Sequence, residues 1–128
     1  MKRLMIASVV LLAWVSGEAM ASCTSPIVAD PGSLLSGKTV CAILGSEEWQ
    51  EYHNGGGSIV DYKRGSSDPV DPSKTVGTWN ATGGSVTYNY GSGGTYSYEV
   101  HDNGGGSYTF CGARTIDATL RAGQVSCH

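Results

Sequence analysis

The 128-residue chain is poor in basic residues, with eight lysines and arginines against eleven aspartates and glutamates. These few cations form no stripe or run, so the electrostatic footprint of a protein that binds nucleic acid is missing. The same deficit argues against binding to an anionic membrane surface. We therefore expect neither nucleic acid nor a membrane surface among the partners.

The sequence also lacks the short motifs of common catalytic and metal sites. It has no Gly-x-Ser-x-Gly elbow, no His-Glu-x-x-His pair and no Gly-Lys-Ser/Thr ending, so its glycine clusters are best explained as turns. It has no Cys-x-x-Cys pair, and no third ligand follows His53 and His101 at a metal-binding spacing. We expect no enzyme activity, no cofactor and no metal, and we expect both histidines to be exposed.

The N-terminal residues have the pattern of a secretory signal peptide. Lys2 and Arg3 precede an apolar run at 4–15 that is too short to span a bilayer, and small residues follow at the cleavage positions. We expect cleavage after Ala21, which leaves a single β domain over 22–128 with six basic and ten acidic residues. The alternative is an uncleaved membrane anchor. The expected location is the periplasm, the cell surface or the medium.

Four cysteines remain in the expected mature chain: Cys23, Cys41, Cys111 and Cys127. An even number in a small exported domain indicates two disulfides, but three pairings are available and the sequence does not choose among them. Residues 20–23 loosely resemble a lipobox, yet a lipid on Cys23 would leave an odd thiol. We expect structural disulfides, each stabilising the fold by about 2–4 kcal/mol.

Most of the chain alternates apolar and polar residues between glycine-rich turns, which is typical of half-buried antiparallel strands. The pattern is clearest over 85–111. Further candidate strands cover 38–44, 47–53, 58–63, 75–82 and 115–121, while 24–36 reads as an irregular arm. With about eight strands, short connections and no convincing helix, we expect an all-β antiparallel meander that forms a small barrel or barrel-like sandwich.

The alternation places six aromatic residues on one face of three neighbouring strands: Tyr88, Tyr90, Tyr96, Tyr98, Tyr108 and Phe110. Such a face can bind a sugar, a peptide or a small apolar molecule, as a stacking platform or a lined cavity. The alternative is that these rings simply form the core. The tyrosines and Trp79 are the candidate ligand-binding residues. The loop at 64–74, with two Asp-Pro steps, is a second candidate surface or a rigid spacer.

Acidic residues gather around two of the expected hairpins. Glu47, Glu48, Glu51, His53 and Asp61 lie near the first, and Glu99, His101 and Asp102 near the third. Alternation puts Glu51 on the same face as Trp49 and His53, an arrangement from which glycoside hydrolysis by paired carboxylates could start. The simpler interpretation is a solvated rim.

Two resemblances concern families. Gly77-Thr78-Trp79 resembles the Gly-x-Trp of lipocalins, whose tryptophan packs across the barrel floor, although the lipocalin motif lies on the first strand. A broader set of segments resembles small exported, functionally uncharacterised proteins of Gram-negative bacteria, some of them seroreactive antigens; it comprises 35–41, 49–51, 61–63, 68–72, 76–79, 88–90 and 108–112. This resemblance implies export and antibody recognition, and it supplies no catalytic residue.

Together these patterns favour an exported, non-enzymatic monomer that binds a small molecule, glycan or peptide through the aromatic face or the 64–74 loop. One alternative is a surface or periplasmic antigen, or a protein-interaction module, that has no small ligand. A second alternative is a small glycan hydrolase.

Overall fold

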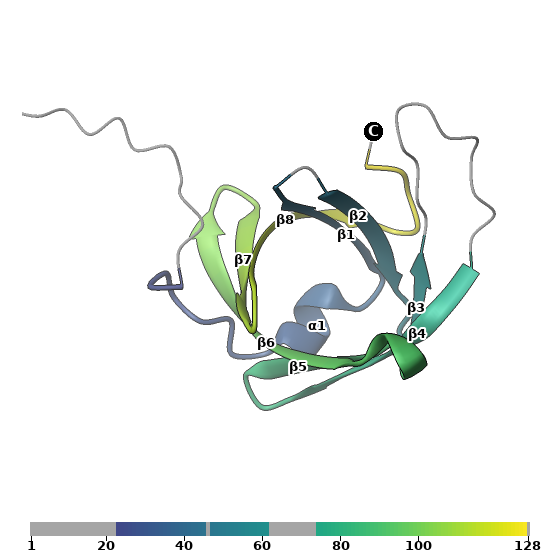
Figure 1. Cartoon of the computed structure of the whole chain (residues 1–128). Coiled ribbons are helices and arrows are strands. Elements are labelled where there is room, and N and C mark those ends of the chain that lie inside the picture. Colours follow the sequence, from purple (N-terminus) through teal and green to yellow (C-terminus); the bar gives the residue numbers. More distant parts are fainter. Residues whose placement is uncertain (1–22, 46, 62–73, 128) are drawn as a thin grey trace, which may run out of the picture.

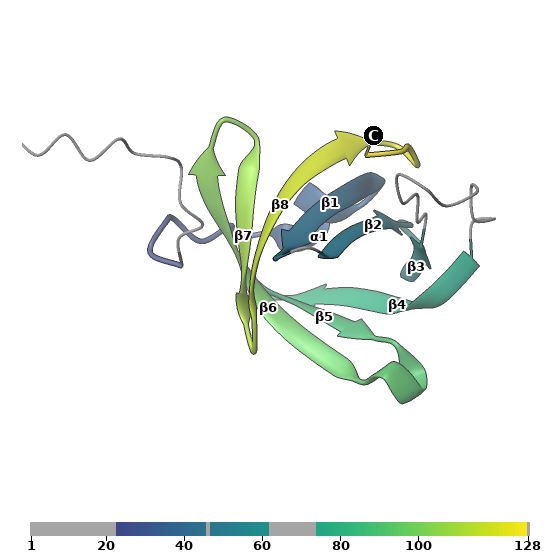
Figure 2. The same ribbon diagram turned by 45° about the horizontal axis from the view of Figure 1, so that its top comes forward.

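The computed structural model describes residues 23–45, 47–61 and 74–127. The expected cleavage site and all but the last residue of the 64–74 loop lie outside these ranges. Within them the chain forms a closed barrel in which every strand pairs antiparallel with the next and the last pairs with the first (Figures 1 and 2). The strands are β1 (Lys38–Leu44), β2 (Glu47–His53), β3 (Ser58–Asp61), β4 (Lys74–Thr82), β5 (Ser85–Asn89), β6 (Thr95–Gly104), β7 (Ser107–Gly112) and β8 (Thr115–Ala122).

This architecture confirms the expected all-β antiparallel meander. Of the two expected forms, a small barrel or a barrel-like sandwich, the structure shows the closed barrel. A short 3₁₀ turn, η1 (Gly91–Gly93), connects β5 to β6, and the other described connections between strands are short turns. Because each of the described strands has two neighbours, the barrel that they form has no open sheet edge.

The expectation of no helix was wrong, because the N-terminal arm contains one helical turn, α1 (Pro31–Leu35). Asp30 caps it by accepting hydrogen bonds from the Ser33 hydroxyl and backbone N–H, and these bonds lower the pKa of the Asp30 carboxyl. Proline at the first helical position also favours this start. A single turn is too short to show helical periodicity, so the sequence pattern could not reveal it.

Viewed down the barrel, α1 lies across the interior (Figure 1). It contacts β1, β4 and β5, and Leu35 is completely buried. Val86, Val100 and Ile59 are equally buried in the same core cluster. Full burial of such a side chain contributes about 1.5–3 kcal/mol. Because α1 directly precedes β1 and packs against β1, β4 and β5, it closes the end of the barrel where β1 begins and β2 ends.

The two disulfides join Cys23 to Cys111 and Cys41 to Cys127. The prediction of two structural disulfides is confirmed, and the structure selects this pairing from the three that the sequence allowed. Each disulfide ties a terminal segment to a strand, the N-terminal arm to β7 and the C-terminal segment to β1. They span 88 and 86 residues, so each removes much freedom from the unfolded chain.

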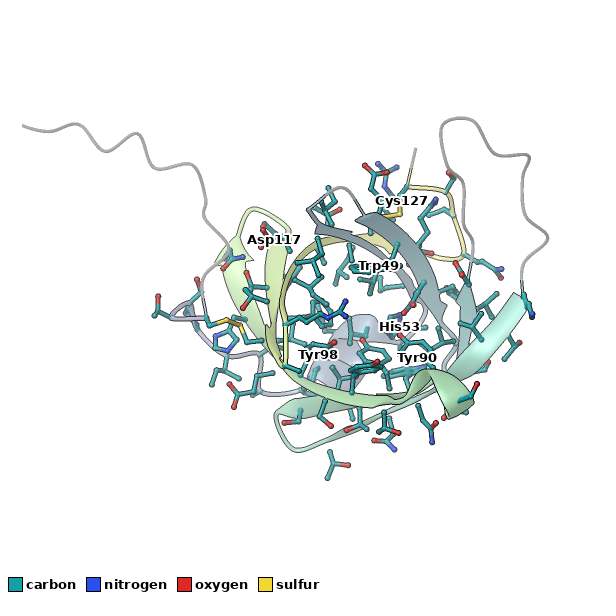
Figure 3. All side chains as sticks on the ribbon, viewed as in Figure 1. Trp49, His53, Tyr90, Tyr98, Asp117 and Cys127 are labelled. Atoms are coloured by element: carbon teal, nitrogen blue, oxygen red, sulfur yellow. A yellow bond between two sulfur atoms is a disulfide. The ribbon has the colours of Figure 1, made fainter. Side chains whose placement is uncertain are left out.

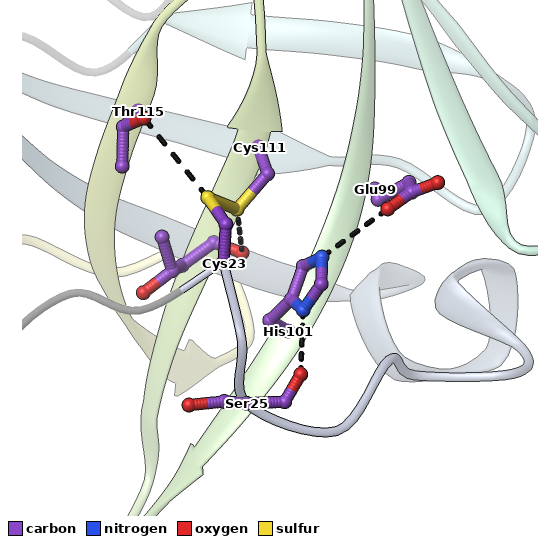
Figure 4. Close-up of polar contacts among 7 residues, drawn as sticks. Cys23, Ser25, Glu99, His101, Cys111 and Thr115 are labelled. Carbon is purple, nitrogen blue, oxygen red and sulfur yellow. Dashed lines mark hydrogen bonds and ion pairs between the residues drawn. A yellow bond between two sulfur atoms is a disulfide. The ribbon is translucent and has the colours of Figure 1, made fainter.

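The N-terminal arm also covers part of the outer barrel surface. The Val28 N–H donates to the Val100 carbonyl over 2.7 Å, and the Asp102 N–H donates to the Pro26 carbonyl over 2.8 Å. His101 lies beneath the arm, where its Nδ1–H donates to the Ser25 carbonyl over 2.6 Å (Figure 4). With 4% of its surface exposed, His101 contradicts the expectation of an exposed histidine.

Candidate ligand-binding cavity

The barrel interior encloses a cavity of about 400 Å³ that is partly open to solvent. All eight strands contribute to its lining. Several lining residues lie where strands end away from α1: Asp61 ends β3, and Tyr96 stands near the start of β6. The cavity therefore lies mainly toward the end of the barrel opposite α1, and it reaches inward as far as His53, the last residue of β2. Its size falls in the range of small-molecule sites.

Six aromatic side chains line this cavity: Trp49, Tyr88, Tyr90, Tyr96, Tyr98 and Phe110. The Tyr88 and Tyr90 rings stack with centroids 6.1 Å apart, and Tyr98 lies 6.0 Å from Tyr88 and 6.2 Å from Phe110. Figure 3 shows Trp49, Tyr90 and Tyr98 inside the ring of strands, with Asp117 and Cys127 outside it. Five of the six rings come from the face that alternation predicted, and Trp49 joins them from β2.

Two of the candidate ligand-binding residues are elsewhere. Trp79 is buried but does not line the cavity; its Nε1–H donates to the Asn54 carbonyl over 2.9 Å. Tyr108 is half-buried and packs against the core cluster, again outside the cavity lining. Strand alternation predicts which side chains point into the barrel. It does not predict where along the barrel axis the interior is packed and where it forms a cavity, so it could not separate Trp79 and Tyr108 from the lining residues.

His53 lies between the cavity and the core and is only 1% exposed, which also contradicts the expected exposure. Its Nδ1 lies 3.1 Å from the Glu51 carbonyl, and its Nε2 lies 2.8 Å from the Tyr88 hydroxyl. Because a carbonyl only accepts, we assign the proton to Nδ1, so that Nε2 accepts from the Tyr88 hydroxyl. Burial lowers the pKa of His53 to about 4, so the ring is neutral at neutral pH.

Two carboxylates face the same cavity. Glu51 and Asp61 are directly opposite one another in the β2–β3 ladder, and both line the cavity. The Tyr90 hydroxyl donates to Glu51 Oε2 over 2.8 Å. Burial first, and then the charge of Glu51, raise the pKa of Tyr90 well above its usual value. The phenol therefore keeps its proton at neutral pH and holds the Glu51 carboxylate in place.

The predicted acidic cluster is therefore split by the barrel. Trp49, Glu51, His53 and Asp61 come together inside, as alternation predicted for the first three. Glu48, Glu99 and Asp102 are exposed and do not line this cavity. Glu99 instead lies 3.3 Å from His101 Nε2 on the outer surface (Figure 4).

Four lining residues were not among the candidates drawn from the sequence: Val40, Val76, Arg114 and Ile116. Arg114 belongs to the turn between β7 and β8 and carries no periodic signal. Val76 lies at a register shift: Ile59 pairs with Gly77 and Val60 pairs with Thr75, so Val76 has no partner in this ladder. The topology of a closed barrel could have suggested Arg114, since the β7–β8 turn lies at the same end as the β5–β6 connection.

Tyr98 carries a hydroxyl that has no hydrogen-bond partner within the described ranges, although the residue is only 8% exposed and lines the cavity. Burial raises the pKa of this phenol, and the nearby positive charge of Arg114 opposes that rise. A neutral phenol can both donate and accept, so a bound molecule could be recognised at this point.

A smaller cavity of about 190 Å³ lies beside the Cys41–Cys127 disulfide, between β1, β2, β8 and the start of β7. It has one aromatic lining residue, Trp49, which it shares with the larger cavity. The larger cavity is the better candidate because it combines an extended aromatic wall with a few polar groups, the composition of small-molecule sites. Among residues 23–45, 47–61 and 74–127, no group of three or more histidines, cysteines or acids could hold a metal ion.

The chain matches no family model, no curated protein and no solved structure. The described part of the chain contains no helix long and apolar enough to cross a membrane.

Proposed function

We propose that this protein is a non-enzymatic binding protein that holds a small molecule inside the open half of its barrel. The observation that carries the proposal is the aromatic-walled cavity of about 400 Å³. Protein interiors are close-packed and keep few voids larger than a water molecule. A small domain with this much space next to its tyrosines therefore lacks van der Waals contacts along the cavity wall. A bound molecule would supply these contacts.

The surrounding structure supports a preformed site. The barrel is closed, α1 covers one end and two disulfides fix both terminal segments to the strands. A site that is already shaped before binding loses little conformational entropy when the ligand enters. The disulfides also fit an oxidising compartment, and we include export to the periplasm, cell surface or medium in the proposal.

A neutral fluorescent probe, N-phenyl-1-naphthylamine, tests the location of binding in the oxidised protein. Val76 lines the cavity from β4, and Asn80 lies exposed on the same strand. Val76→Trp should fill the cavity and abolish the fluorescence enhancement of the probe. Asn80→Trp adds the same ring outside and should leave the probe affinity unchanged.

Equal probe binding by both variants would show that the cavity is not the site. If no small aromatic compound of any charge binds the protein, the proposal is wrong, and the protein-interaction alternative gains support. Circular dichroism of both variants confirms that each has kept the barrel.

A further inference from the structure

One tyrosine of the cavity differs from the others in what its hydroxyl contacts. Three cavity tyrosines donate their hydroxyls to acceptors within the protein: Tyr88, Tyr90 and Tyr96. Tyr98 has no such acceptor in the described part of the chain, although only 8% of its surface is exposed and it lines the cavity. Its hydroxyl is therefore available to hydrogen-bond a molecule inside the barrel.

The β7–β8 turn brings a cation next to this tyrosine. Gly112, the last residue of β7, pairs with Tyr98, and a Cβ there would come within 2.8 Å of the Tyr98 ring. The Gly112 N–H donates to the Arg114 carbonyl over 3.1 Å, so Arg114 stays close to the strand end on which the ring lies. Burial raises the pKa of Tyr98, and the next largest effect is that of Arg114, whose positive charge lowers it. Arg114 and Tyr98 therefore border the same part of the cavity.

Among the described residues that line the cavity, Arg114 is the one with a permanent positive charge. It is exposed, and its guanidinium forms no hydrogen bond or ion pair within the described ranges. The carboxylates of the cavity, Glu51 and Asp61, have other interactions and belong to β2 and β3, the second and third strands beyond β8 around the barrel. The charge of Glu51 affects the Tyr98 pKa less than that of Arg114 does. The polar groups on the β6–β7–β8 side of the cavity thus favour an anion.

We propose that the cavity binds a small organic carboxylate. Its anionic group accepts hydrogen bonds from the Arg114 guanidinium and the Tyr98 hydroxyl. Its apolar body packs against Phe110 and Ile116, which pair across β7 and β8 and both line the cavity. A planar guanidinium presents two parallel N–H donors to a carboxylate, and such charge-assisted hydrogen bonds are about twice as strong as neutral ones. This inference rests on the proposed function and adds the chemical class of the ligand.

Calorimetric titration of the oxidised protein with three size-matched probes at neutral pH tests the charge preference. The probes are 3-phenylpropionate, an anion, 3-phenylpropanamide, which is neutral, and 3-phenylpropylamine, a cation. The carboxylate should bind about tenfold more tightly than the amide, because only its hydrogen bonds are charge-assisted on both sides, and the amine should bind most weakly. Equal or tighter binding of the amide or the amine overturns the inference and leaves the cavity as a binding site. If none of the three binds while N-phenyl-1-naphthylamine does, the inference alone fails; if that probe also fails to bind, the proposed function fails with it.

Two cavity variants and two matched controls separate recognition from general damage. Arg114→Gln should weaken carboxylate binding about tenfold and amide binding less than about threefold. Tyr98→Phe keeps the ring and should weaken both about fivefold. Arg121→Gln removes the same charge from an exposed position on β8, and Tyr108→Phe removes a hydroxyl outside the cavity lining, so both should leave all affinities unchanged.

The inference fails if Arg114→Gln keeps full carboxylate affinity or loses the amide as much as the carboxylate. It also fails if Arg121→Gln weakens carboxylate binding as strongly as Arg114→Gln, because the effect would then come from net charge alone. Full carboxylate affinity of Tyr98→Phe would overturn the role of the hydroxyl. Circular dichroism of each variant shows whether the barrel has been kept.

Discussion

Acidification should destabilise the barrel through His53. In the folded protein, burial lowers the pKa of this histidine from 6.5 to about 4. An unfolded chain exposes the ring and restores the ordinary pKa, so the unfolded state binds the proton first as the pH falls. The stability contributed by the neutral ring is therefore complete above about pH 6.5 and is lost progressively down to about pH 4.

The size of the loss follows from the difference between the two pKa values. Each pKa unit corresponds to about 1.4 kcal/mol, so the His53 contribution amounts to about 3 kcal/mol over this interval. That is a large part of the net stability of a small domain, which is about 5–15 kcal/mol. Protonation also removes the acceptor at Nε2, so the Tyr88 hydroxyl on the cavity wall loses its partner.

Urea unfolding of the oxidised protein at a series of pH values between 7 and 4 measures this slope. The carboxylates titrate in the same range, so the comparison that matters is with His53→Gln, which has no titratable ring. The free energy of unfolding of the parent protein should fall more steeply, by up to about 1.4 kcal/mol per pH unit. Identical slopes for the two proteins would refute a neutral, buried His53.

Three further changes test the fold. Replacing Cys23 and Cys111 together by serine opens an 88-residue loop and should cost about 4–5 kcal/mol in guanidinium unfolding; a loss below 1 kcal/mol would show that the disulfide constrains little. Leu35→Ala, which truncates the fully buried last residue of α1, should cost about 2–5 kcal/mol by the same measurement, and a neutral result would mean that α1 does not seal the barrel. Gly112→Ala should lower the melting temperature, because a Cβ there would overlap the Ser97 carbonyl and the Tyr98 ring at a cost of about 1–3 kcal/mol. An unchanged melting temperature for Gly112→Ala would contradict the close approach of β6 and β7.

The strands were predictable because most are half-buried, so one face of each carries mainly apolar or aromatic side chains. The same rule placed Tyr88, Tyr90, Tyr96 and Tyr98 on the inner face, and a closed barrel turned that face into a wall. Turns were predictable because glycine alone tolerates positive φ easily. Gly104, which ends β6, and Gly105 and Gly106, which follow it, all adopt positive φ in the β6–β7 hairpin.

What escaped prediction depends on contacts between distant segments. His101 stands at an outward-facing position of β6, where the arm that Cys23 holds in place covers it. Arg114 enters the cavity from a turn, and Val76 enters it at a register shift. None of these positions follows from the local order of residues, because each requires knowing which segment lies across from it in space.

The disulfide pairing should keep the molecule in one piece after a protease has cleaved its backbone. The two cross-links overlap, since Cys41 lies between Cys23 and Cys111, and Cys111 lies between Cys41 and Cys127. A single cut anywhere from residue 23 to residue 127 therefore leaves both fragments covalently joined. Between residues 41 and 111, which include every connection from β1 to β7, two cross-links hold the pieces together. A nicked molecule should thus migrate as one species on a gel until it is reduced, and it can keep its barrel after its backbone has been broken.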